Sequence, residues 1–224
     1  MSEKVSSPSY YPVFLDIAGK RCVVVGGGQV ALRKVKTLLE YGAKVEVISP
    51  ELCPELAAIT EISVRHRQYQ PGDLKGAFLA IVATNNHEIN HRIAGEARSQ
   101  GVLVNVVDDA EYCDFILPSL VRRGDMTIAV STAGRSPALA RKLRTRLEQD
   151  FGGEYAVLVR LIDEVRLELK QRGIAVDSET WQEALELDLL TGLVKLGQTE
   201  KARVLLKEGL SRRLLEKQEE VRRV

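Results

Sequence analysis

The chain has 224 residues, of which 45% are hydrophobic, and this supplies an ordinary globular core for one medium domain with an appendage or for two small domains. Its formal net charge of +1 excludes a global electrostatic field that would attract nucleic acid or a membrane surface. No stretch reaches the roughly 20 apolar residues that span a bilayer. Three cysteines without paired spacing indicate free thiols in a reducing compartment, so we expect a cytoplasmic protein.

A glycine-rich loop between a strand and a helix stands near the start of the chain. Residues 22–25 form an apolar run of strand length, and residues 29–41 have the apolar spacing of an amphipathic helix. Residues 44–48 favour a second strand. A strand, a helix and a strand in this order, within about thirty residues, predict a right-handed parallel crossover.

Three small residues of this unit fit the dinucleotide-binding pattern G-x-G-x-x-[G/A]. Gly26 permits the tight turn, Gly28 lets the backbone approach a pyrophosphate, and Ala31 lets the helix pack closely on the strand. The helix N-terminus favours an anion. A glycine turn that only packs is the alternative interpretation. We predict that the cofactor is held here by Gly26, Gly27, Gly28, Gln29 and Val30.

The acidic residue that usually binds the adenine ribose is missing from the end of the second strand. Ser49, Pro50 and Glu51 occupy that place, and any ribose contact is expected from them or from their backbone. Glu46 lies inside the strand and is expected to point away. Because no arginine directly follows the strand to bind a 2′-phosphate, we predict NAD as the cofactor.

The following segment alternates strands with helices. Strands are expected at residues 62–69, 77–83 and 102–107, and a helix is expected at residues 86–100. The run at 77–83 is apolar throughout, which is typical of a central parallel strand buried on both faces. The alternation predicts an α/β fold, a Rossmann-type doubly wound parallel sheet, over residues 1–113.

The pattern changes after residue 113. Residues 114–121 and 126–131 are expected to pair as antiparallel strands, and Ser136 followed by Pro137 predicts a helix start. Together they predict a small α+β segment over residues 114–150. The apolar positions of the new helix form one narrow seam that suits a partner helix; they are Leu139, Leu143 and Leu147.

The remainder of the chain, residues 151–224, is predicted to be a helical C-terminal domain. Helices are expected at residues 155–171, 178–196 and 199–222 from their apolar periods. Possible breaks are marked by Gly173, Gly197 and Gly209.

Four longer motifs carry a resemblance to a known family. They are PVFLDIAGKRCVVVGGGQVALRKVKTLLEYGA at 12–43, AIVATNN at 80–86, NVVDD at 105–109 and FILPSLVRRGDMTIAVSTAGRSPALARKLR at 115–144. Over residues 10–150 the chain resembles the precorrin-2 dehydrogenase and sirohydrochlorin ferrochelatase family, the N-terminal module of siroheme synthase. Beyond residue 155 it matches only in being helical. The methyltransferase domain of the fused family members is expected to be absent.

The resemblance implies an NAD-dependent dehydrogenase that converts precorrin-2 to sirohydrochlorin in siroheme biosynthesis. Some family members also insert ferrous iron into sirohydrochlorin. It further implies a homodimer in which residues 114–150 act as a dimerisation segment, with the pocket between this segment and the nucleotide domain. No nucleic acid or membrane partner is expected. The alternative is a nucleotide-sensing regulatory module without catalysis, which explains the glycine loop but not NVVDD or STAGRSPALA.

Asp108 is the candidate catalytic residue. It follows the strand at 102–107, at the sheet edge where such folds bind ligands, and it matches the active-site aspartate of the family. Dehydrogenation needs a hydride acceptor and a proton acceptor, and Asp108 is predicted to be the latter. A solvated loop acid, or a turn cap with Asp109, is the alternative. Further cofactor contacts are expected from Thr84, Asn85 and Val106, although the first two suit helix caps equally well.

The tetrapyrrole substrate implied by the resemblance bears many carboxylates, so its pocket is expected to be rich in cations. The predicted substrate-binding residues are Arg122, Thr132, Arg135 and Ser136. The cations of the following helix are predicted only to solvate one of its faces; they are Arg141, Lys142, Arg144 and Arg146.

His87, Glu88 and His91 satisfy the zinc motif H-E-x-x-H, and Glu111 offers a third ligand. His87 falls in the loop or first helical turn after a buried strand instead of in the middle of a helix, and Glu111 lies in a loop after another strand, which argues against a zinc hydrolase. We therefore predict no metal site and interpret both histidines as helix-surface residues. The thiols of Cys22 and Cys113 are predicted to be packing groups.

Overall fold

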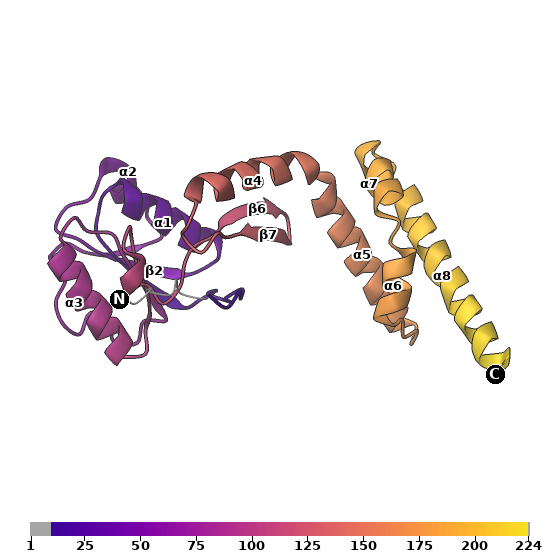
Figure 1. Ribbon diagram of the computed structural model, residues 1–224, viewed down its shortest axis with the longest axis horizontal. Helices are drawn as coiled ribbons and strands as arrows, with labels where there is room; N and C mark the ends of the chain where they lie inside the picture. The colour runs from indigo at the N-terminus through magenta and orange to yellow at the C-terminus, as the bar shows by residue number, and fades with distance from the viewer. Residues whose placement is uncertain (1–9, 224) are drawn as a thin grey trace, which may run out of the picture. The chain divides into compact units, whose positions relative to one another are not determined.

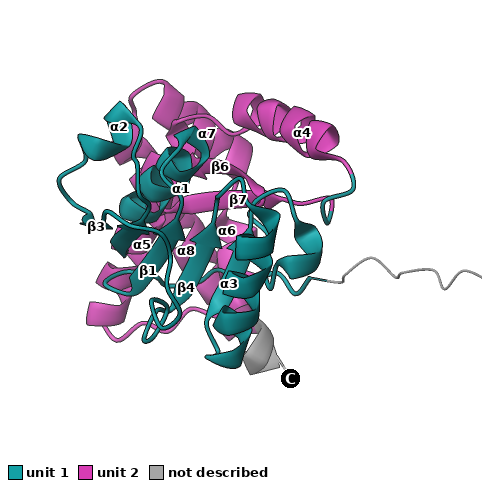
Figure 2. Ribbon diagram, turned by 90° about the vertical axis from the view of Figure 1, so that its left-hand side faces the viewer, with its two compact units in different colours: residues 1–117, 133–135 teal, residues 118–132, 136–224 magenta. Residues whose placement is uncertain are grey.

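The computed structural model of the protein describes residues 10–223, with side chains to residue 219 (Figure 1). It divides into two compact units, one of residues 1–117 with 133–135 and one of residues 118–132 with 136–224; Figure 2 distinguishes them by colour. The three-part division of the sequence stays a prediction. None of the described helices is long and apolar enough to cross a membrane.

The first unit is built on a five-stranded sheet in which every pair of neighbouring strands is parallel. The strand order is β3-β2-β1-β4-β5, which confirms the predicted doubly wound α/β fold. The strands are β1 (Arg21–Val25), β2 (Lys44–Ile48), β3 (Ser63–Arg65), β4 (Leu79–Val82) and β5 (Leu103–Val106).

Helices cover both faces of this sheet (Figures 1 and 2). The helices are α1 (Gln29–Glu40), α2 (Pro54–Ala57) and α3 (His87–Ser99), with a 3₁₀ turn η1 (Ala110–Tyr112) after β5. Because side chains alternate along a strand, Val24 packs with Val35 of α1 while its neighbour Val23 packs with Ile93 of α3. Each of these side chains is fully buried, which stabilises the unit by roughly 1.5–3 kcal/mol per side chain.

The second unit begins with an antiparallel hairpin and continues as helices. Its elements are β6 (Ser119–Arg123), β7 (Met126–Val130), α4 (Pro137–Asp150), α5 (Glu154–Gln171), α6 (Ser178–Ala184), α7 (Leu187–Lys195) and α8 (Thr199–Arg223). Ser136 caps α4 as predicted, because its hydroxyl oxygen accepts from the Leu139 amide at 3.2 Å. Leu161, Leu190 and Leu206 belong to the buried core of the later helices.

The first hairpin strand starts later than predicted, at Ser119 instead of residue 114. Residues 114 and 115 are held by the first sheet. The Asp114 amide donates to the Val104 carbonyl oxygen at 2.8 Å, and the Asn105 side chain donates to the Phe115 carbonyl oxygen at 2.9 Å. These hydrogen bonds hold residues 114 and 115 beside β5, so the first strand of the hairpin begins only after them.

Three further boundaries differ from expectation. The strand predicted at 62–69 is limited to Ser63–Arg65, and the helix predicted at 178–196 is divided between Ala184 and Leu187. Gly209 does not break α8; an added Cβ there would lie 3.7 Å from the Ala184 Cβ, so the small residue lets α6 approach α8. Gly173 and Gly197 do follow helix ends, with positive φ angles of 72°.

Candidate active site

Three loops lie side by side at the carboxyl edge of the sheet. Val25 of β1 is in register with Val82 of β4, and Val82 is in register with Val106 of β5. The loops that follow these three strands therefore leave the sheet at the same level. They contain Asp108 and part of the residues predicted for cofactor binding, which are Gly26, Gly27, Gly28, Thr84 and Asn85.

Two glycines of the first loop are required by close packing. Gly26 has a φ of 123°, and a Cβ added there would overlap the carbonyl group of Ala83 at the end of β4. A Cβ at Gly27 would overlap the carbonyl group of Glu51. The Gly27 carbonyl oxygen also accepts from the Cys53 amide at 2.8 Å. The loop is thus held closely between the ends of β2 and β4.

Packing does not explain the third glycine. Gly28 is exposed, and a Cβ added to it would meet no described atom within 4 Å. Gly28 is the N-cap of α1 and has no side chain that could bind the first-turn amides. The first turn of α1, which is fully described, also carries no acidic residue. The first-turn amides are therefore available to an anion, with a favourable helix dipole. The loop fits a dinucleotide pyrophosphate.

The other residues predicted to bind the cofactor near the glycine loop differ in their exposure to solvent. Gln29 is exposed and its amide nitrogen donates to a Glu55 carboxylate oxygen at 3.1 Å, whereas Val30 is half-buried. Ser49 is buried, and its hydroxyl donates to the Glu51 carbonyl oxygen at 2.7 Å. Pro50 and Glu51 are exposed. The Glu51 carboxylate is therefore better placed than the Ser49 hydroxyl to contact a ribose.

Glu46 belongs to a separate charged cluster. Its carboxylate accepts from Arg21, at 2.5 Å and 2.9 Å, and it also pairs with Arg65. Arg21 begins β1, so Glu46 is directed away from the edge with the glycine loop. Arg65 also pairs with Asp73 at 2.9 Å. Arg65 is in register with Ile48, the last residue of β2, and its guanidinium is already engaged by these two carboxylates.

The loop after β4 is organised by a different pair of residues. The Thr84 hydroxyl donates to the Asn90 side-chain oxygen at 2.5 Å, and the Asn90 nitrogen donates to the Thr84 carbonyl oxygen at 3.1 Å. The cap of α3 is Asn86, whose side chain accepts from the Ile89 amide. Asn85 is exposed at the loop tip. Val106, in contrast, is buried, so a cofactor would meet its backbone.

Asp108 is exposed and has a φ of 61°, a left-handed conformation that is uncommon for non-glycine residues, although aspartate adopts it more often than most. Cys113 supplies bonds that hold the loop in this conformation. Its thiol lies 3.2 Å from the carbonyl oxygens of both Val106 and Asp109, and the Val106 amide donates to its sulfur at 3.2 Å. The loop is closed across its base, and Asp108 is held at its tip.

Lys34 of α1 is a neighbour of this loop that the sequence did not reveal. Burial of its side chain and the nearby Arg33 lower the pKa of Lys34, and the negative charge of Asp108 partly opposes that shift. Lys34 therefore places a cationic group within electrostatic range of Asp108. Only the fold brings them together, since they are far apart along the chain.

The histidine motif lies at the start of α3, as predicted, but makes contacts that were not predicted. His87 is exposed, as expected, but His91 is half-buried and its Nε2 lies 2.9 Å from an Asp109 carboxylate oxygen. The His91 ring stacks on Tyr112 with centroids 3.7 Å apart. Glu111 instead lies in η1, where its carbonyl oxygen accepts from Arg98. His91 lies on α3 with its side chain 38% exposed, as expected of a helix-surface residue, but its contacts with Asp109 and Tyr112 were not predicted.

The cysteines behave as the predicted packing groups. Cys22 is fully buried in β1, and burial raises the pKa of its thiol to about 11. Burial is also the main cause that raises the pKa of Cys113. All three cysteines, including Cys53, are free. The buried thiols are therefore protonated and unreactive at neutral pH.

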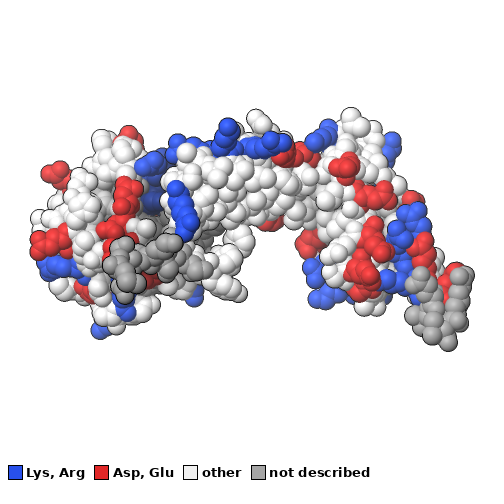
Figure 3. All heavy atoms as spheres, in the orientation of Figure 1, with Lys and Arg blue, Asp and Glu red and all other residues white. Residues whose placement is uncertain are grey.

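The predicted substrate residues are divided between the two units. In the second unit, the Thr132 hydroxyl accepts from the Ser136 amide at 3.0 Å, and the Arg122 guanidinium donates to the Gly124 carbonyl oxygen at 3.3 Å. In the first, Arg135 is exposed. Ala133 nearby has a φ of 51°. Figure 3 shows the cations of α4 gathered along one exposed face, in agreement with the solvation predicted for them.

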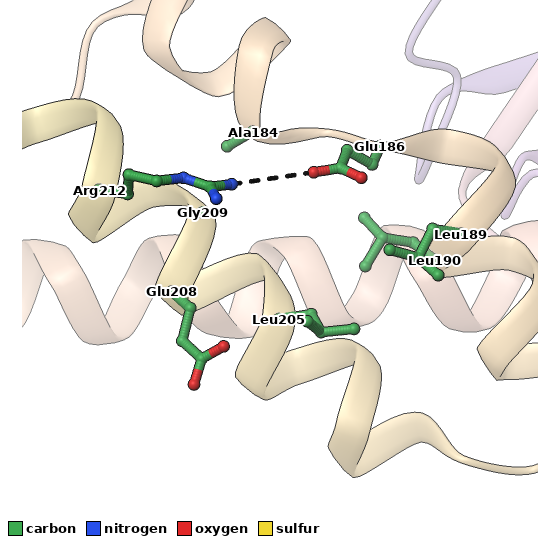
Figure 4. A pocket seen from close by; sticks show the side chains of 8 residues that line it. All are labelled: Ala184, Glu186, Leu189, Leu190, Leu205, Glu208, Gly209 and Arg212. Atoms are coloured by element: carbon green, nitrogen blue, oxygen red, sulfur yellow. Dashed lines mark ion pairs between the residues drawn. The ribbon is translucent and has the colours of Figure 1, made fainter. Parts of the chain in front are cut away.

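Two surface hollows lie among the later helices. One, of about 300 Å³, lies between α7 and α8 against Leu189, Leu190 and Leu205, and at its rim Arg212 faces Glu186 at 4.0 Å (Figure 4). The other, of about 370 Å³, lies beside Trp181. Neither includes a residue that the sequence nominated for cofactor or substrate.

Comparison with known proteins agrees with this geometry. A family model described as "Putative NAD(P)-binding" matches residues 13–119, and one described as "Sirohaem biosynthesis protein central" matches residues 123–150. The siroheme synthase of Chromobacterium violaceum is 41% identical over 182 residues, which are 79% of this chain and 39% of that protein. The siroheme synthase of Nitrosococcus oceani is 39% identical over 217 residues, covering 95% of this chain and 46% of that protein.

A solved structure of SirC, a precorrin-2 dehydrogenase, matches with a TM-score of 0.71 and 25% identity, over 89% of this chain and 100% of that one. The chain spans less than half the length of the two siroheme synthases. Its first unit contains an NAD(P)-binding domain. The chain belongs to the siroheme synthase family and corresponds to its N-terminal module, the region that SirC also represents.

Proposed function

We propose that this protein is a precorrin-2 dehydrogenase that uses NAD and forms sirohydrochlorin. One observation carries the proposal: Asp108 is exposed, in a constrained conformation, at the same sheet edge as a glycine loop that is open only at Gly28. The bonds of Cys113 hold the loop that carries Asp108 in this conformation. The names of the relatives, siroheme synthase and precorrin-2 dehydrogenase, support the same reaction.

The cofactor would be held by backbone groups. Gly28 and the first-turn amides of α1 bind the pyrophosphate, the Glu51 carboxylate contacts the adenine ribose, and Thr84 and Asn85 lie toward the nicotinamide. A bound nicotinamide accepts the hydride that leaves the substrate. Arg65 is engaged by Glu46 and Asp73 and is not available to a 2′-phosphate, which favours NAD over NADP.

The proton released with the hydride needs an acceptor. Asp108 offers two carboxylate oxygens at the loop tip, where it receives the proton and passes it to water. The constrained backbone fixes the carboxylate before substrate arrives, which lowers the cost of aligning it. Lys34 contributes positive charge within electrostatic range of this carboxylate.

The substrate carboxylates require cations and directed donors. Arg122, Thr132, Arg135 and Ser136 are the residues that we assign to them, because arginine forks bind carboxylates bidentately. The protein is expected to act as a homodimer. Leu139 and Leu143 of α4 are 49% and 41% exposed at a spacing of four residues, as for a helix that packs on a second copy.

A second activity, the insertion of ferrous iron into sirohydrochlorin, is suggested by the siroheme synthase relatives. The two activities are tested in sequence, anaerobically, with the purified protein. Precorrin-2 and NAD should give the absorbance of sirohydrochlorin, and ferrous iron should then convert it to siroheme. Asp108→Asn should abolish the first step while NAD still binds. Failure of the unaltered protein to oxidise precorrin-2 would leave the nucleotide-sensing role as the better explanation.

A further inference from the structure

Two histidines and a carboxylate converge at the start of α3, beside the candidate active site. His87 and His91 are one helical turn apart, and Asp109 reaches them from the loop after β5. One ligand atom from each of the three lies within 4.8 Å of the other two. We propose that His87, His91 and Asp109 form a binding site for a divalent transition-metal ion.

The separations fit a metal ion after a small adjustment. Imidazole nitrogens and carboxylate oxygens bind such ions at about 2.1 Å, so neighbouring ligand atoms in a tetrahedral site lie about 3.4 Å apart. The exposed His87 side chain has room to turn toward this distance. The distance of 2.9 Å between His91 Nε2 and the Asp109 oxygen is that of a hydrogen bond, and the ion would replace its proton.

The structure fixes the other two ligands in advance. The His91 ring stacks on Tyr112 at an angle of only 9°, which sets its orientation. The backbone of Asp109 is fixed by two contacts. Its amide donates to the Val106 carbonyl oxygen, and its own carbonyl oxygen lies 3.2 Å from the Cys113 sulfur. Rigid support of this kind strengthens metal binding, since less side-chain freedom is lost.

The ligand set selects the class of ion. Imidazole binds Zn²⁺, Fe²⁺, Co²⁺ and Ni²⁺ well, whereas Mg²⁺ and Ca²⁺ prefer sites made of oxygen. Two histidines and one carboxylate also leave coordination positions open. The site therefore suits an ion that is exchanged or passed on better than one with a purely structural role.

The location adds a consequence that rests on the proposed function. Asp109 directly follows Asp108, so an ion on this site lies next to the residue assigned to the tetrapyrrole. If the protein inserts ferrous iron, this site presents the ion at the sheet edge where the macrocycle binds. The metal site itself is tested without any tetrapyrrole, which separates its failure from failure of the proposed reactions.

The experiment titrates the full chain, freed of metal with a chelator, with Co²⁺ under anaerobic conditions. Visible ligand-field absorption should saturate at one ion per chain, and calorimetry with Zn²⁺ should give the same stoichiometry. His87→Gln and Asp109→Asn should each weaken binding by roughly 10–100-fold or more. His87 is exposed, so its variant should keep the parent's thermal unfolding temperature.

Two matched variants serve as controls. Glu111→Gln removes the acid that the sequence motif offered as third ligand, and His66→Gln removes an exposed histidine elsewhere in the unit. Both should bind Co²⁺ as the unaltered protein does. The proposal is overturned if Co²⁺ gives only the spectrum of the hydrated ion, if His87→Gln binds with unchanged affinity, or if Glu111→Gln has the effect expected of Asp109→Asn.

Discussion

The Val106 amide donates to the sulfur of Cys113, and the Cys113 thiol lies 3.2 Å from the Val106 carbonyl oxygen. This reciprocal contact closes the loop that carries Asp108. Cys113→Ala should therefore lower turnover of precorrin-2 with little change in NAD affinity, and it should lower the free energy of unfolding by about 1–2 kcal/mol. Cys113→Ser, which keeps a donor, should recover part of both losses. Unchanged turnover in the alanine variant would show that the thiol does not position Asp108.

The positive φ of Asp108 predicts a conflict between stability and activity at one position. Glycine adopts this conformation without strain, whereas alanine retains the strain. Asp108→Gly should be more stable than Asp108→Ala by about 1 kcal/mol in urea unfolding, yet both should lack dehydrogenase activity. Equal stability of the two variants would mean that the loop relaxes once the carboxylate is removed.

Gly26 and Gly28 belong to one motif but should respond differently to the same substitution. Gly26→Ala places a Cβ against the Ala83 carbonyl group at a φ of 123°, and we expect a loss of roughly 3 kcal/mol in unfolding free energy. Gly28→Ala meets open space and should leave the unfolding free energy nearly unchanged while weakening NAD binding.

The measurements are urea unfolding and calorimetric NAD titration of both variants. If Gly28→Ala binds NAD as tightly as the parent protein, the pyrophosphate does not approach the loop at that residue. If Gly26→Ala is as stable as the parent, the end of β4 can move away without cost.

The sequence was sufficient for the sheet because its signals are local. The continuous apolar runs of β1 and β4 and the small residues after β1 predict parallel strands and a tight turn wherever they occur. The position of Asp108 at the carboxyl edge follows from the strand order alone. The late start of β6 was not predictable, because it depends on side-chain bonds from Asn105 and Asp114 across the sheet edge.

The candidate site was predicted less completely than the fold. The spacing of His87 and His91 was visible, but their third neighbour, Asp109, comes 18 residues after His91 and meets it only because β5 lies beside β4. Glu111, which fitted a linear motif equally well, lies in a turn whose backbone faces Arg98. Lys34 carried no motif at all. Charge pairs between separate elements require the fold before they can be recognised.

Asp73 gives the first unit a predictable pH dependence. It is 5% exposed and accepts hydrogen bonds from Arg65, Arg67 and the Gln70 amide. The Arg67 bonds are the largest cause that lowers the pKa of Asp73 below its ordinary value, against an opposing effect of burial. A carboxyl group with a lowered pKa stabilises the fold above its unfolded pKa, about 3.9, and this contribution is lost as the pH falls through the folded pKa.

Asp73→Asn should therefore lower the unfolding free energy by roughly 2 kcal/mol at pH 7, because bonds to charged groups are lost. The difference from the parent should begin to shrink below about pH 4, where Asp73 of the unfolded chain takes up a proton, and should be lost as the pH falls through the lowered pKa of the folded carboxyl group. Urea unfolding across this range measures it, with Asp125→Asn, an exposed acid of the β6–β7 turn, as the control that should keep the parent's profile. A difference that persists undiminished to the lowest pH would assign the effect to packing of the side chain instead of its charge.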